Sequence, residues 1–196
     1  MSRHSPITLP SNSGPPGSAQ TKPVNRITVI QGQARASADP QAEMNTILGS
    51  CVATCLFDPV ARVGGMNHFL LAEPPKSTRG DGFDSNYGLY LMELLVNEML
   101  QLGAVKSRLK GRLYGGANIN ADLGSFGSAN AAFAREFLAR EGIEKVFEDL
   151  EGTRARRIQF RPASGLVRCR EVAPVAAPTD KPLVRPQSAL GNVELF

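Results

Sequence analysis

The chain is poor in the residues that build disulfide frameworks and metal sites. Its 196 residues include three cysteines and two histidines. A small and odd number of cysteines excludes a paired disulfide framework and favours a reducing cytosol. A metal held by Cys51 and Cys55 would need further ligands, and His68 is the one histidine nearby. No metal and no other cofactor is therefore expected.

The chain also lacks any long apolar run. No stretch reaches the length of a membrane-spanning helix, so membrane insertion is not expected. Arg3 and His4 near the N-terminus are followed by no apolar segment, which argues against a signal peptide. These features predict a cytoplasmic protein.

The chain also has only a small excess of charge of either sign. The formal net charge is +4, from 22 basic and 18 acidic residues. The basic residues of segments 106–112 and 154–161 interleave with apolar ones, which is typical of a solvated strand face rather than a nucleic-acid-binding stripe. A basic face of this kind could favour an acidic protein partner.

Composition divides the chain into one domain and two tails. Residues 1–25 are rich in Pro, Ser, Gly and Thr, and residues 173–196 are dominated by Pro and Ala. Segments with so little apolar surface cannot offset the entropy of ordering, so both are expected to be disordered. Residues 26–172 are predicted to form a single domain.

Periodicity within that domain predicts two helices among several strands. The helices are Tyr87–Leu102, capped by Ser85 or Asn86, with Glu93 and Glu98 facing solvent, and Ser128–Arg140. The predicted strands are Arg26–Gln31, Met44–Leu48, Val52–Phe57, Met66–Leu71, Ser107–Tyr114, Lys145–Leu150, Arg156–Arg161 and Leu166–Glu171. The predicted loops are Gly32–Gln41, Lys76–Asn86, which could flank an active site, and Asn120–Gly127. This order predicts an α/β fold, a layered sandwich of a mixed β-sheet and two main helices.

The chemistry is concentrated between Met44 and Pro75, which include Cys51 and His68. Two apolar runs separated by a turn near Pro59 predict an antiparallel hairpin. With the turn centred on residues 59–60, Cys51 lies directly opposite His68, with Cβ atoms about 5 Å apart. A slip of one residue would place the two side chains on opposite faces.

A thiol beside an imidazole is a nucleophile beside a base, because the imidazolium favours the reactive thiolate. The alternative is that Cys51 is a small buried hydrophobic residue and His68 a hydrogen-bonded core histidine. Cys55 is expected to pack within its strand. The polar amide of Asn67, beside His68 in an apolar run, is a further candidate for the site.

Several other groups could bind the substrate or an oxyanion. Backbone amides of Gly49 and Ser50 lie next to the candidate nucleophile in sequence. Gly115 and Gly116 follow a predicted strand, where glycine permits a positive φ or a close backbone approach. The amide of Gly116 or the side chain of Asn118 could contribute to an oxyanion pocket. The alternative for this segment is a plain tight turn.

The sequence around these residues resembles the chemoreceptor glutamine deamidase family, CheD. The resemblance rests on LGSCVATCLFDP followed by GGMNHFLL, and it covers Ile27 to Val172. Later blocks follow in the family's order: YGLYLMELLVNEMLQLGA, GGAN, FAREFLAREGI, EDLEGT, RRIQF and PASGLV. The resemblance implies a layered α/β sandwich. It also implies a protein-glutamine glutaminase with Cys51 as nucleophile, His68 as base and Thr46, or the adjacent Asn45, as third residue.

The family resemblance also implies partners. The expected substrates are the cytoplasmic domains of methyl-accepting chemotaxis receptors, and a CheC-type phosphatase of the response regulator is a second expected partner. A regulatory binding module that docks these proteins with little catalysis is the alternative. The same Cys–His pair would also serve protein cleavage or amide transfer, because the acyl-enzyme chemistry is shared.

Overall fold

The computed structural model describes residues 23–71, 85–119 and 126–173. Most of both expected tails lies outside the described residues, as do the loop at 76–84, the side chains of Ser85 and Asn86, and most of the loop at 120–127. Within the described part, no helix is long and apolar enough to cross a membrane.

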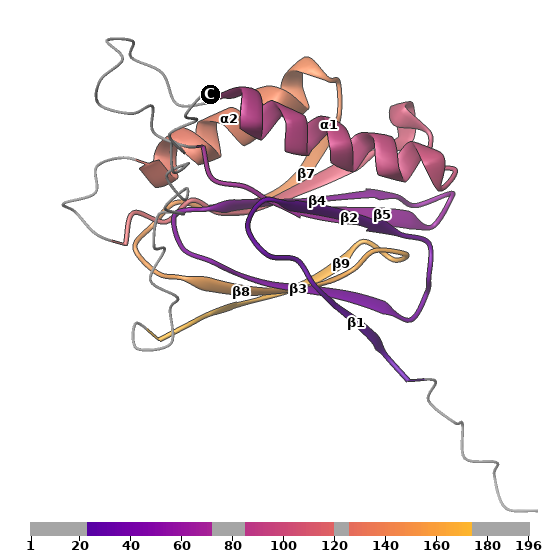
Figure 1. Ribbon diagram of the computed structural model, residues 1–196, viewed down its shortest axis with the longest axis horizontal. Coiled ribbons are helices and arrows are strands. Elements are labelled where there is room, and N and C mark those ends of the chain that lie inside the picture. Colours follow the sequence, from indigo (N-terminus) through magenta and orange to yellow (C-terminus); the bar gives the residue numbers. More distant parts are fainter. Residues whose placement is uncertain (1–22, 72–84, 120–125, 174–196) are drawn as a thin grey trace, which may run out of the picture.

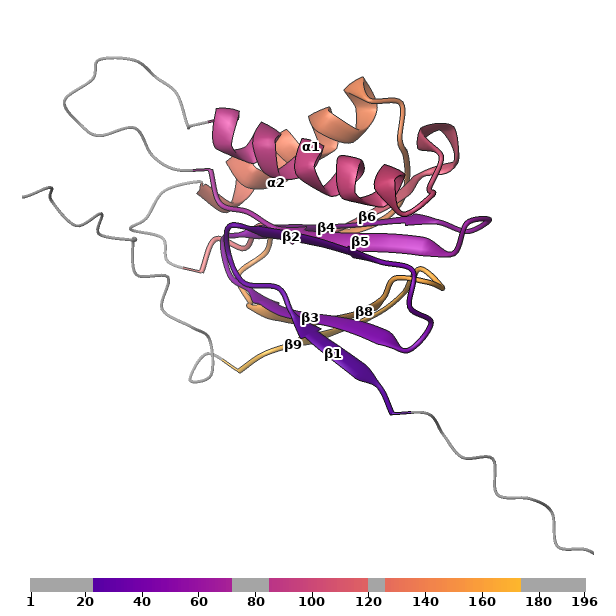
Figure 2. The same ribbon diagram turned by 45° about the vertical axis from the view of Figure 1, so that its right-hand side comes forward.

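The domain has three layers, with two helices above a five-stranded sheet and a four-stranded sheet below (Figures 1 and 2). The helices are α1 (Ser85–Gln101) and α2 (Phe126–Arg140). The five-stranded sheet has the order β2 (Gln33–Ser37), β5 (Val63–His68), β4 (Val52–Asp58), β6 (Lys110–Gly115) and β7 (Glu144–Leu150). The four-stranded sheet has the order β1 (Asn25–Thr28), β3 (Ala42–Leu48), β8 (Arg156–Arg161) and β9 (Leu166–Glu171). The predicted α/β sandwich with two helices is confirmed, although the strands form two mixed sheets rather than one.

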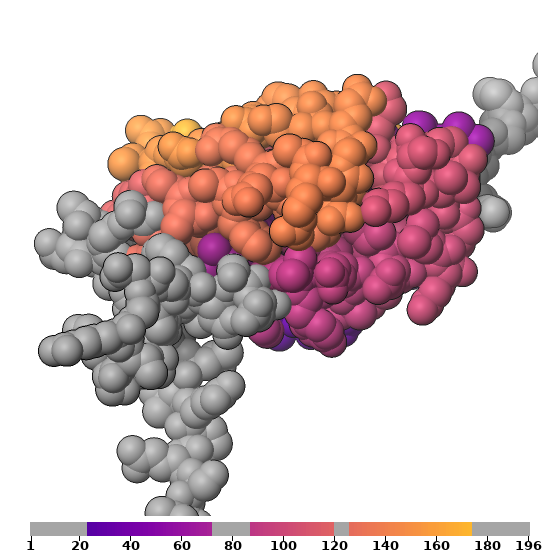
Figure 3. Space-filling view, turned by 90° about the horizontal axis from the view of Figure 1, so that it is seen from above, coloured from indigo at the N-terminus to yellow at the C-terminus, as the bar shows by residue number. Residues whose placement is uncertain are grey.

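Two apolar cores separate the layers. One lies between the helices and the five-stranded sheet, and the other lies between the two sheets. Strand β4 runs through the middle layer, so all seven of its residues are buried, with Leu56 in the helix-side core and Cys55 in the inter-sheet core. This double burial explains why its sequence is continuously apolar rather than alternating. From the helix side, α1 and α2 cover the sheet (Figure 3).

The chain changes sheets at the candidate nucleophile. Strand β3 belongs to the four-stranded sheet and β4 to the five-stranded sheet, and Gly49–Ser50–Cys51 join them. Cys51 therefore lies at one end of the inter-sheet core, where side chains from both sheets meet.

The predicted loop Gly32–Gln41 was wrong, because it contains strand β2. Its side chains are small or polar, so it lacks the large apolar residues by which a strand is recognised. It pairs with β5 at the sheet edge, and Ala34 is buried in the helix-side core. The amide of Ala36 donates a hydrogen bond to Glu98 Oε2 at 2.9 Å, so Glu98 secures the edge strand rather than only facing solvent.

The predicted strand Ser107–Tyr114 was wrong at its start. A 3₁₀ turn, η1 (Lys106–Arg108), precedes β6, because Arg108 and the amide of Val105 donate hydrogen bonds to the buried carboxylate of Asp58. Burial alone would raise the pKa of Asp58, but these bonds, with amides from its own turn, hold it well below its usual value.

Candidate active site

The hairpin register differs from the prediction by two residues. Strand β4 pairs Cys55 with Met66, and the pairing continues to a bridge between Val52 and Phe69. The predicted direct opposition of Cys51 and His68 was therefore wrong. A shift of two residues preserves the face of each side chain, so the two remain diagonal neighbours facing the second sheet.

The turn causes the shift. Asp58 and Val63 form the last pair, so the turn comprises residues 59–62 and is centred one residue later than predicted. The Asp58 side chain accepts hydrogen bonds from the amides of Val60 and Ala61, and Arg62 adopts φ 57°. An aspartate that caps its own turn in this way sets the turn length.

His68 is held by a side chain from the other sheet. Its Nδ1 lies 2.9 Å from Thr46 Oγ1, and both residues are buried, at 7% and 6% exposure. The same nitrogen lies 3.4 Å from the carbonyl oxygen of Val29. A carbonyl oxygen can only accept, so this contact favours the tautomer with the proton on Nδ1 and the basic lone pair on Nε2.

The alternative third residue, Asn45, faces the other way. Its Nδ2 donates to the carbonyl of Glu43 at 3.0 Å on the outer face of β3. Adjacent strand residues point to opposite faces, so only Thr46 can reach the inter-sheet layer. The geometry therefore selects Thr46 as the partner of His68.

Cys51 is 1% exposed, and its thiol donates to Oε1 of Gln31 at 3.8 Å. Gln31 lies in the turn between β1 and β2, and sequence analysis missed it because that segment has no motif. The turn is fixed to the site by a 2.8 Å bond from the amide of Gly32 to the carbonyl of His68. Gln31 lies close to Cys51 because β2 pairs with β5, which the sequence alone does not show.

Three successive carbonyls of the Cys51 turn are anchored. The carbonyl of Gly49 accepts from the amide of Ala117 at 2.9 Å, and that of Cys51 accepts from the amide of Gly116 at 2.8 Å. The carbonyl of Ser50 accepts from Nδ2 of Asn130 at 2.9 Å. These bonds fix the backbone around Cys51.

Asn130 is a second residue that the sequence did not reveal. Its Oδ1 accepts from the amide of Leu71 at 2.8 Å.

The glycine pair at the end of β6 makes this anchoring possible. Gly115 and Gly116 have φ values of 103° and 65°, and a Cβ at Gly115 would collide with the carbonyl oxygen of Cys51. The expected positive φ and close approach are confirmed. The suggestion that the Gly116 amide serves an oxyanion is corrected, because that amide already donates to Cys51.

The two asparagines proposed for the site both make contacts within the fold. Asn67 points towards α1, where it accepts from the amide of Thr54 at 2.9 Å and donates to Met92 Sδ at 3.0 Å. It lies on the face of β5 opposite to His68 because strand neighbours alternate. Asn118 donates to Ser128 Oγ at 3.0 Å, in the first turn of α2.

The other two thiols are poor nucleophiles. Complete burial raises the pKa of Cys55 far above its ordinary value, and its expected packing within the strand is confirmed. Burial, together with a hydrogen bond to Asp149, raises the pKa of Cys169 to about 12. Among the residues that the structure describes, no group of three or more His, Cys, Asp or Glu side chains could hold a metal.

Comparisons with known proteins identify similar chains over most of this sequence. Residues 70–171 match the family described as CheD chemotactic sensory transduction. Relatives described as probable chemoreceptor glutamine deamidase CheD occur in Zymomonas mobilis, with 48% identity over 87% of this chain and 92% of that protein, and in Caulobacter sp. K31, with 47% identity over 89% and 94%.

A further relative with the same description, from Acidiphilium cryptum, is 46% identical over 93% of this chain and 99% of its own. Among solved structures, a Neisseria meningitidis protein of family DUF152 has a TM-score of 0.43 and 14% identity over 66% of this chain and 65% of its own. The family match covers more than half of the chain and these relatives are 46–48% identical over most of its length, so the chain belongs to the CheD family.

Proposed function

We propose that this protein is a chemoreceptor glutamine deamidase, which hydrolyses glutamine side-chain amides of chemotaxis receptors to glutamate. The observation that carries the proposal is the 2.9 Å bond between Thr46 and His68, on the same inner layer as Cys51. The names of its relatives supply the substrate class. On this proposal the protein acts in the cytoplasm on receptor cytoplasmic domains, and a CheC-type phosphatase is a second expected partner.

The reaction proceeds in two steps, acylation of Cys51 and hydrolysis of the thioester. The Cys51 thiolate attacks the side-chain carbonyl carbon, and His68, protonated on Nε2, donates its proton to the departing ammonia. The resulting thioester is then attacked by water, from which His68 Nε2 takes a proton, and the products are glutamate and the regenerated thiol. Thr46 and the Val29 carbonyl hold Nδ1, so the imidazole keeps one orientation through both steps.

The groups around the thiol supply candidates for the oxyanion donors. The backbone amides of Gly49, Ser50 and Cys51 belong to a turn that three hydrogen bonds hold rigid, and rigid donors stabilise a developing charge without reorganisation. The carboxamide of Gln31 lies within reach of the sulfur and can contact the tetrahedral intermediate.

The function is tested by incubating a receptor cytoplasmic fragment with the protein. Mass spectrometry should find a gain of about one dalton at particular glutamines, because hydrolysis replaces NH₂ by OH. Cross-linked or amine-modified glutamine would instead indicate transfer, and cleaved backbone would indicate proteolysis. Receptor binding with unchanged mass would favour the binding module.

We expect Thr46→Val to lower kcat about tenfold with little change in KM, because the imidazole loses one of two groups that orient Nδ1. Steady-state kinetics on a glutamine peptide measures this. Thr46→Ser keeps a hydroxyl and should recover most of the activity. Asn45→Ala is the matched control, because the neighbouring side chain lies on the outer face. Equal losses in Thr46→Val and Asn45→Ala would contradict the assignment.

We expect Gln31→Met, which preserves length without the amide, to lower kcat/KM about tenfold. The loss of one oxyanion donor can cost 10²–10³-fold in kcat. A smaller loss is expected here, because the 3.8 Å contact from the Cys51 thiol to Gln31 Oε1 is long and the Gln31 Nε2 amide would share the oxyanion with backbone amides. Iodoacetamide should still alkylate Cys51, which shows that the nucleophile is intact. Unchanged kinetics would remove Gln31 from the site.

A further inference from the structure

The outer face of the four-stranded sheet is covered by no helix or strand of the described residues (Figures 1 and 2). Strand alternation sends one arginine of β1, two of β8 and two of β9 to this face. They are Arg26, Arg157, Arg161, Arg168 and Arg170, and we call them the arginine face.

The arginine face has far more positive charge than the fold neutralises. Its one carboxylate, Glu43, lies 3.7 Å from Arg26 and 3.9 Å from Arg161. Within the described ranges, the other three arginines form no ion pair. Arg157 and Arg170 are directly opposed partners in the β8–β9 register, and like charges in that position destabilise a sheet. Folding alone therefore does not explain this arrangement.

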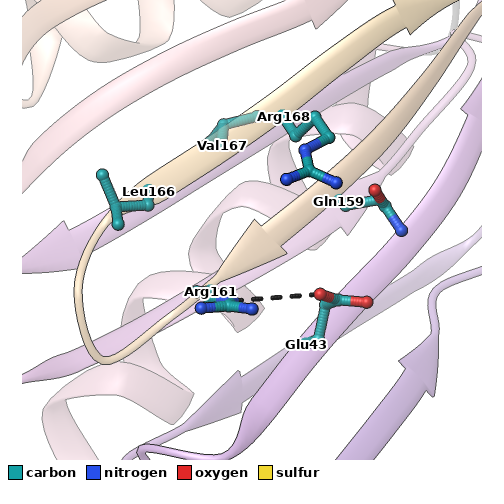
Figure 4. Close-up of a pocket in the computed structure, with 6 residues that line it drawn as sticks. All are labelled: Glu43, Gln159, Arg161, Leu166, Val167 and Arg168. Carbon is teal, nitrogen blue, oxygen red and sulfur yellow. Dashed lines mark ion pairs between the residues drawn. The ribbon is translucent and has the colours of Figure 1, made fainter. Parts of the chain in front are cut away.

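The face is also hollowed. A cavity of about 290 Å³ is lined by Glu43, Gln159, Arg161, Leu166, Val167 and Arg168. Figure 4 shows Arg161 paired with Glu43 and the Arg168 side chain extending beside Gln159. The planar guanidinium groups suit bidentate recognition of carboxylates, and Leu166, at 62% exposure, offers an apolar contact at the rim.

The charge identifies the class of occupant as an acidic polypeptide. The chain's own tails do not match, because residues 1–22 contain no Asp or Glu and residues 174–196 contain as many basic as acidic side chains. A single-stranded nucleic acid would be expected to stack on aromatic side chains, and the described strands turn none to this face.

We propose that the arginine face is an exosite that docks an acidic segment of the protein substrate. This proposal rests on the proposed function. Strand β3 connects the two sites, since Glu43 lies on its outer face while Thr46 points inward to His68. Each turnover converts a neutral glutamine into a glutamate, so a partly deamidated substrate should bind the arginine face more tightly than an unmodified one.

The test compares two substrates and two double variants of the full-length protein. Arg168→Glu/Arg170→Glu reverses two charges on the face. Arg62→Glu/Arg140→Glu makes the same change in net charge at exposed positions elsewhere. Deamidation is measured on a receptor cytoplasmic fragment and on a short, uncharged glutamine peptide.

We expect the first variant to lose about tenfold in kcat/KM on the receptor fragment at low salt, mainly through KM, and less than about twofold on the peptide. The difference should shrink at about 0.5 M salt, where screening acts over about 4 Å. The control should behave like the unmodified protein on both substrates.

Three outcomes would overturn the exosite. They are an equal loss of kcat/KM on both substrates, an equal loss in both variants, and no loss on the receptor fragment. If the unmodified protein deamidates neither substrate, the proposed function fails and direct binding decides the exosite. The unmodified protein should then bind the fluorescently labelled receptor fragment about tenfold more tightly than the arginine variant does. Equal binding would refute the exosite independently of catalysis, and preferential binding of a labelled RNA oligonucleotide would assign the face to nucleic acid.

Discussion

Cys51→Ala and Cys51→Ser are expected to abolish deamidation while leaving the domain folded. The thiolate forms the bond to the substrate carbonyl carbon, and neither a methyl group nor a serine hydroxyl of much higher pKa replaces it. Loss of a nucleophile typically costs about 10⁴-fold or more in kcat. Mass analysis of receptor glutamines measures the activity, and circular dichroism checks the fold.

Cys55→Ala is the matched control for Cys51→Ala, because it removes a thiol on the same face of the same hairpin. Cys55 is completely buried, so its loss should lower stability by about 1 kcal/mol and leave most of the activity. An inactive Cys55→Ala beside an active Cys51→Ala would show that the nucleophile had been assigned to the wrong thiol.

His68→Ala is expected to have the second largest effect, because the mechanism uses this residue first as an acid and then as a base. Losing a positioned acid–base group costs about 10²–10⁴-fold in rate. The variant should also move the pH of half-maximal Cys51 alkylation upward, because the buried thiol is left without a neighbouring imidazolium. The direction follows because the imidazolium that would stabilise the thiolate is gone.

Receptor binding should change little in His68→Ala, since binding uses a wider surface than one buried imidazole. Normal turnover with an unchanged alkylation profile would return His68 to the role of a core histidine. Lost receptor binding with intact turnover on a small peptide would instead support a docking role. The two readouts separate catalysis from binding because alkylation reports on the thiol alone.

The sequence predicted the features that depend on local periodicity. The two helices, the strands of the β4–β5 hairpin and the β8–β9 hairpin have patterns of apolar residues that determine which side of each element is buried. Cys51 and His68 were placed on one face, and this survived a register error because a shift of two residues preserves the face.

The sequence could not supply contacts between elements that are distant along the chain. Thr46 and Asn45 are adjacent and both polar, and only the stacking of the two sheets turns Thr46 towards His68. Asn67 was assigned to the site because it is next to His68 in sequence, yet the pleat turns its side chain towards α1. Gln31 lacks a motif and reaches Cys51 only because β2 pairs with β5.

The sequence by itself therefore determined most of the elements, with β2 as the main exception, together with their buried faces and the candidate thiol and imidazole. Tertiary structure decided which side chains meet them. The physical reason is that side-chain alternation and turn chemistry act over a few neighbouring residues, whereas sheet order and register result from packing summed over the whole domain. Gly116 is an example. The sequence around it is compatible with either an oxyanion donor or a tight turn, and the tertiary structure directs its amide to the carbonyl of Cys51.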